Sequence, residues 1–135
     1  MTATRPSPHP SHVSRPFWDA CARHELVLQR CTSCSSAVFY PRPVCPACGS
    51  RQLDWVPATG YGTLHTYTVA RRATHRKLAD RVPYVIAVVE LDEGPRLTST
   101  VVGTDPDDLA IGSRLQVDFE DGETVSFPVF RVVRS

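Results

Sequence analysis

The sequence has 135 residues, 41% hydrophobic and 21% charged, values typical of one small globular protein with a single core. Its formal net charge of +1 excludes a polycation that binds nucleic acid through charge alone. The sequence has no apolar run of about 18 residues, as a membrane helix requires, and residues 2–14 lack the apolar centre of a signal peptide. We therefore expect a cytoplasmic protein without a membrane anchor.

The N-terminal part predicts a tail followed by one short helix. Residues 1–14 are rich in Pro, Ser, His and Thr, which predicts a disordered tail. Ser14 is a favourable N-cap, and Pro16 suits the first turn of a helix. Residues at helical spacing then continue through about residue 25: Phe17, Ala20, Cys21 and His24. We expect Cys21 to be a buried side chain, because no neighbouring feature would lower the pKa of its thiol.

Two cysteine pairs of the form C-x-x-C follow, separated by ten residues: Cys31 with Cys34, and Cys45 with Cys48. Strand-like segments flank them at 25–30, 37–40 and 52–56. In a reducing compartment such pairs indicate metal more than disulfides. Four thiolates complete the tetrahedron around Zn²⁺ and leave no vacant position, so the predicted site is structural and not catalytic.

Three alternatives to zinc remain open for these cysteines: iron in a rubredoxin-like centre, two disulfides, and a site that has lost its metal. The ligand set suits iron as well as zinc. However, Ser35 follows the first pair, where rubredoxins usually have glycine, and the aromatic residues of an electron carrier are not evident.

After Gly60 the sequence consists of strand-like segments separated by turns. The expected strands cover 62–70, 83–91, 96–103, 114–120 and 124–133. Residues 105–108 suit a loop that can hold one helical turn. Five strands without a long helix fit a small barrel such as the OB-fold. We therefore predict a mainly β protein, with a helix and zinc ribbon over 15–59 and a five-stranded OB-fold barrel over 60–135.

Charge is unevenly distributed in the second half. Residues 71–81 carry five basic residues and one acidic residue, whereas the remainder of 61–135 has four basic and ten acidic residues. A focused positive patch attracts anions, and arginine binds phosphate with two parallel hydrogen bonds. We call the candidate ligand-binding residues the basic segment: Arg71, Arg72, Arg76 and Lys77. The alternative is a solvated loop without a ligand.

The strand expected near residues 84–91 is apolar on both faces apart from Glu90. Its outer side therefore needs cover, either from the N-terminal segment or from another protein. The sequence contains no nucleophile–base pair, Walker loop or H-E-x-x-H motif, so we predict no catalytic residues.

The ordered set of motifs resembles a known family of small proteins. The motifs are Phe17-Trp18, the two cysteine pairs, Gly60-x-Gly62-Thr63-Leu64, Tyr67-Thr68-Val69, Val82-Pro83-Tyr84-Val85, Val89-Glu90-Leu91-Asp92-Glu93-Gly94 and Ile111-Gly112. The resemblance covers residues 15–133 and is to proteins that join a rubredoxin-like zinc ribbon to an OB-fold, long catalogued as of unknown function.

Members of that family are typically non-catalytic companions of thiolase-fold enzymes of the acetyltransferase, thiolase or retro-aldolase type, and some join acyl-CoA hydratases. The resemblance implies that the barrel docks on such an enzyme and helps form its acyl-CoA channel. The basic segment would then suit the phosphates of coenzyme A. Two other classes stay open: a nucleic-acid-binding zinc-ribbon/OB module, which the acidic barrel disfavours, and a stand-alone enzyme or electron carrier.

Overall fold

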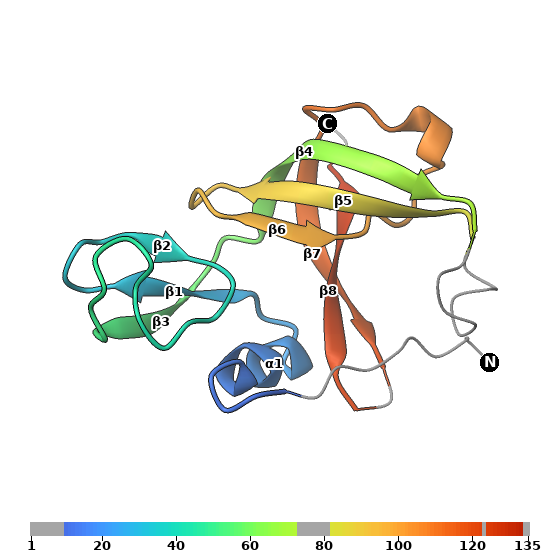
Figure 1. Ribbon diagram of the computed structural model, residues 1–135. Helices are drawn as coiled ribbons and strands as arrows, with labels where there is room; N and C mark the ends of the chain where they lie inside the picture. Colours follow the sequence, from blue (N-terminus) through green and yellow to red (C-terminus); the bar gives the residue numbers. More distant parts are fainter. Residues whose placement is uncertain (1–9, 73–81, 123, 134–135) are drawn as a thin grey trace.

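Regular structure begins with the predicted short helix. The computed structural model describes residues 10–72, 82–122 and 124–133 (Figure 1). Helix α1 spans Arg15–Ala22, with Ser14 at the N-cap position and proline in the first turn. The Ser14 hydroxyl does not cap the helix and instead accepts a hydrogen bond from the Ser11 N–H at 2.9 Å. The helix ends before the expected residue 25, because His24 adopts a left-handed φ of 59°.

The cysteine-containing part forms a small antiparallel sheet with the order β2-β1-β3. Its strands are β1 (Val27–Cys31), β2 (Ala37–Val38) and β3 (Leu53–Pro57), close to the predicted ranges. Helix α1 packs against β1 and also against the last strand of the chain, so it lies between this sheet and the barrel (Figure 1).

The second half forms a curled five-stranded antiparallel sheet with the order β6-β5-β4-β7-β8. Its strands are β4 (Tyr61–Ala70), β5 (Tyr84–Leu91), β6 (Arg96–Ser99), β7 (Arg114–Asp121) and β8 (Ser126–Val132). A 3₁₀ turn at Pro106–Asp108 lies in the predicted loop. The predicted mainly β architecture is therefore confirmed.

The predicted end of one strand is wrong. The expected strand 96–103 stops at Ser99, where the chain leaves β5 and turns to β8. The Phe130 N–H donates to the Thr100 carbonyl at 2.9 Å, and the Val102 N–H donates to the Phe130 carbonyl at 2.8 Å. The residues that follow Ser99 (Thr100, Val101 and Val102) are types that favour strands, so the sequence resembles one uninterrupted strand. The change brings the open edge of the curled sheet against β8.

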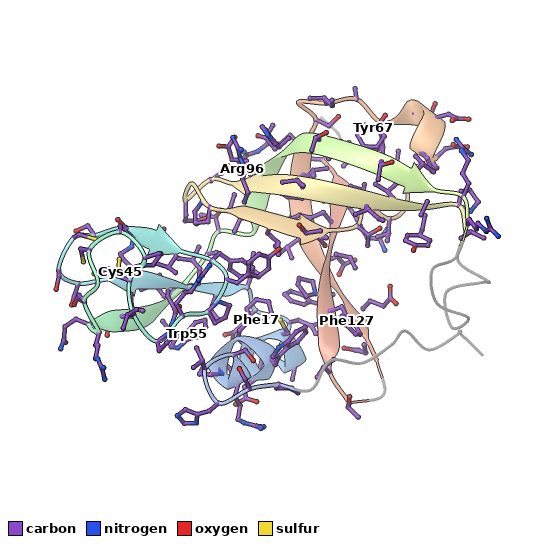
Figure 2. All side chains as sticks on the ribbon, viewed as in Figure 1. Phe17, Cys45, Trp55, Tyr67, Arg96 and Phe127 are labelled. Carbon is purple, nitrogen blue, oxygen red and sulfur yellow. The ribbon has the colours of Figure 1, made fainter. Side chains whose placement is uncertain are left out.

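One hydrophobic core joins the helix, the ribbon and the barrel. Phe17 from α1 contacts Trp18 and Phe39 edge to face, with ring centroids 5.1 and 5.4 Å apart. Figure 2 shows Phe17 and Phe127 in the space that α1, the ribbon and β8 enclose. The buried residues of this core also include Cys21, Leu26, Leu28, Leu64, Val85, Ala87, Val89, Leu91, Leu97, Val101, Leu109, Leu115 and Phe130.

The outer face of β5 stays accessible. Val85, Ala87 and Val89 point into the core, whereas Ile86 on the outer side is 40% exposed. Helix α1 does not supply the expected cover, because it packs on β1 and β8. Residues 1–9 of the predicted tail lie outside the described residues.

Candidate structural metal centre

The two cysteine pairs lie on two turns of the same shape. In the first turn the Ser35 N–H donates to the Cys31 carbonyl, and in the second the Gly49 N–H donates to the Cys45 carbonyl, both at 2.8 Å. Ser35 and Gly49 occupy equivalent left-handed positions, with φ of 65° and 79°. Glycine adopts this conformation freely and serine adopts it at a cost. Serine at the first position therefore leaves the shape of the turn unchanged.

The four sulfur atoms gather at the tip of the ribbon, near the labelled Cys45 in Figure 2. All four lie within 4.8 Å of one another, and the Sγ atoms of Cys31 and Cys48 are 3.6 Å apart. Those of Cys34 and Cys45 are 3.7 Å apart. A tetrahedral ion with metal–sulfur bonds of about 2.3 Å separates its ligands by about 3.8 Å, whereas a disulfide needs about 2.05 Å. No disulfide joins these four cysteines, and their geometry fits one tetrahedral ion.

Local hydrogen-bond donors favour the thiolate form of the first pair. The backbone N–H of Cys34 is the largest cause that lowers the pKa of the Cys31 thiol. The Ser36 hydroxyl, 3.2 Å from the Cys34 sulfur, and the Ser36 N–H lower the pKa of Cys34 to about 6. Metals bind thiolates and not thiols. The first turn is therefore prepared to supply metal ligands.

Burial differs within each pair. Cys31 and Cys45 are buried and pack with Val38 and Leu53, whereas Cys34 and Cys48 are exposed. Four sulfur ligands would saturate a tetrahedral ion and leave no position for water or substrate. The arrangement can therefore hold the ribbon together but offers no Lewis-acid chemistry.

A buried glutamine links the ribbon sheet to the loop that leads to the second pair. The Gln29 amide nitrogen donates to the Arg42 carbonyl at 3.0 Å, and the Arg42 N–H donates to the Gln29 amide oxygen at 2.7 Å. Gln29 is only 5% exposed, so both groups need these partners. Sequence reasoning missed this contact because its partner is a backbone group, for which the sequence carries no signal.

Cys21 has no part in the cluster. Its side chain, on the buried face of α1, is completely buried in the core, and burial raises the pKa of its thiol to about 12. The prediction that Cys21 is a buried side chain is confirmed.

The structure describes half of the basic segment. Arg71 and Arg72 are exposed and follow directly after Ala70, the last residue of β4, which pairs with Tyr84 of β5. Neither arginine forms an ion pair with another described residue. Arg76 and Lys77 lie outside the described residues. Among the described residues, moreover, none of the helices has the length and apolar character needed to cross a bilayer.

Fold and site together define a class of protein: a short helix, a four-cysteine ribbon and then a five-stranded barrel, in that order along the chain. The family models agree. The description "ChsH2, rubredoxin-like zinc ribbon domain" matches residues 18–54, and "ChsH2, C-terminal OB-fold domain" matches residues 55–120. The chain belongs to the ChsH2/DUF35 family, which confirms the resemblance seen in the sequence.

Relatives in this family have different names. A "DUF35 domain-containing scaffold protein" of Methanothermobacter thermautotrophicus is 37% identical over 106 residues, 75% of this chain and 79% of that protein. A "Probable enoyl-CoA hydratase alpha subunit" of Thermomonospora curvata is 38% identical over 130 residues, 96% of this chain. The chain spans only 40% of the length of that hydratase subunit.

A solved structure resembles nearly the whole chain. It is titled "Ltp2-ChsH2(DUF35) aldolase", and one of its chains matches with a TM-score of 0.84 and 37% identity. The match covers 93% of this chain and 98% of that chain. The protein is thus homologous to the DUF35 partner in an aldolase and to part of a hydratase subunit.

Proposed function

We propose that this protein is a non-catalytic accessory subunit that docks on a thiolase-fold enzyme of the acetyltransferase, thiolase or retro-aldolase type. A hydratase-type acyl-CoA enzyme is the related possibility that the hydratase relative raises. The observation that carries the proposal is the match to the DUF35 chain of the Ltp2-ChsH2 aldolase, which extends over 98% of that chain. A relative named a scaffold protein supports the same role.

In this proposal, Cys31, Cys34, Cys45 and Cys48 hold one structural Zn²⁺. Zinc would tie the two turns of the ribbon together and so stabilise the surface that meets the enzyme. The sulfur separations of 3.6 and 3.7 Å support a tetrahedral ion.

The basic segment is proposed to lie at the mouth of the partner's acyl-CoA channel. Its positive charge would attract the phosphates of coenzyme A, which the partner holds. Arg71 and Arg72, exposed at the end of β4, support this role because both guanidinium groups are available to a ligand.

The experiment is affinity purification of the tagged chain from its native host, with the bound proteins identified by mass spectrometry. We expect an enzyme of the thiolase-fold or acyl-CoA hydratase type in a fixed ratio to the chain. Recovery of nucleic acid or of ribosomal proteins, with no acyl-CoA enzyme, would contradict the proposal.

A further inference from the structure

An uncharged surface runs from the ribbon across the outer side of the barrel. It begins at Tyr40, which is 48% exposed and whose hydroxyl oxygen accepts a hydrogen bond from the Thr98 N–H at 3.2 Å. Thr98 pairs with Val88 on the neighbouring strand. Ile86, 40% exposed, lies two residues along the same face of β5. These four residues form one continuous surface, which we call the docking face.

A groove opens beside Tyr40 and Thr98, between α1, the ribbon, β6 and the start of β8. Its volume is about 390 Å³, and five of its lining side chains are aromatic. None of the described residues that line it carries a charge. Grooves of this size at the junction of two structural units commonly bind apolar groups, and aromatic side chains dominate the energetics of protein interfaces. The groove therefore gives the docking face a place for an apolar anchor.

Charge is distributed unequally around the docking face. At one end Arg96 and Glu90 lie 4.0 Å apart and balance each other; Figure 2 labels Arg96 there. Beyond Ile86, at the other end, β5 begins beside the end of β4, which Arg71 and Arg72 follow. A complementary surface must therefore be apolar in the middle and negative beyond Ile86.

We infer that the docking face seats the acyl-CoA enzyme itself. An apolar side chain of that enzyme would occupy the aromatic groove, and the phosphates of its bound coenzyme A would lie opposite Arg71 and Arg72. This inference rests on the proposed function and specifies which surface of the chain carries it out. A nucleic acid fits less well, because it would require positive charge along the whole face.

The test uses the enzyme identified by affinity purification, purified separately, and measures its affinity for variants of this chain by calorimetry. Ile86→Glu and Thr98→Arg place a charge in the docking face. Ile111→Glu is the matched control: Ile111 is 66% exposed and lies on the β7 side of β4, where its neighbour Gly112 donates to the Leu64 carbonyl. Circular dichroism and metal content verify that each variant folds.

We expect Ile86→Glu and Thr98→Arg to weaken binding about tenfold or more, because a charge would be buried without a partner. Ile111→Glu should bind within about twofold of the wild type. If the folded docking-face variants bind as tightly as the wild type, the inference is wrong, while binding itself still supports the proposed function. If the wild type binds no acyl-CoA enzyme, both are wrong. A wild-type homodimer that Ile86→Glu separates, with enzyme binding unchanged, would assign the face to a second copy and also overturn the inference.

Discussion

The two equivalent turns of the ribbon allow a reciprocal exchange, Ser35→Gly in one and Gly49→Ser in the other. A left-handed conformation costs a non-glycine residue about 1–2 kcal/mol, and Ser35 has a φ of 65°. Glycine, however, loses about 0.4–1 kcal/mol more conformational entropy on folding. The difference predicts that Ser35→Gly raises the free energy of unfolding by about 0.5–1 kcal/mol.

Gly49→Ser should shift stability by a similar amount in the opposite direction. A Cβ added at Gly49 meets no atom within 4 Å, so the cost comes from the backbone conformation at φ of 79° and not from a clash. Urea denaturation of the metal-loaded protein measures both variants, and the double exchange should return close to the wild type. A destabilised Ser35→Gly, or an unchanged Gly49→Ser, would show that the left-handed position does not govern the stability of these turns.

Three further predictions concern the metal, the core and the basic segment. Cys45→Ser should reduce zinc below one equivalent per chain and unfold the ribbon, whereas Cys21→Ser should keep full zinc; elemental analysis separates the two outcomes. Phe17→Ala should lower the free energy of unfolding by about 3–5 kcal/mol, because this buried ring joins α1 to the ribbon and the barrel. A loss below about 1 kcal/mol, measured by urea denaturation, would contradict the claim that the three parts share one core. Replacing all four residues of the basic segment by serine should raise the KM for acyl-CoA of the assembled complex, more at low salt than at high salt. Unchanged kinetics at both salt concentrations would show that the basic segment is a solvated loop without a ligand.

Most of the fold could be predicted from the sequence, because its local signals are strong. Runs of strand-favouring residues are separated by turn residues, and the two C-x-x-C pairs indicate a shared metal site. The end of β6 could not be predicted, because strand-favouring residues continue where the chain changes its partner from β5 to β8. The end of α1 was also missed, since it depends on the left-handed conformation of His24, a residue whose spacing still suits a helix.

Part of the candidate site could also be predicted from the sequence. The four cysteines are a local pattern, and the structure brings them together as expected. The Gln29–Arg42 contact and the groove beside Tyr40 depend on tertiary packing between segments that are distant in the sequence. The exposure of the outer face of β5 could be predicted only in part. Its apolar sequence pattern indicates that this face needs cover, but only the structure shows that α1 packs against β1 and β8 instead.

The proposed function is that this chain acts through a partner enzyme and performs no chemistry alone. The most direct test is steady-state turnover of an acyl-CoA substrate by the purified chain, by the purified partner and by their complex. We predict no turnover by the chain, weak or no turnover by the partner, and full activity only when both are present. Turnover by the chain alone, surviving removal of contaminants, or a partner fully active without it, would contradict the account.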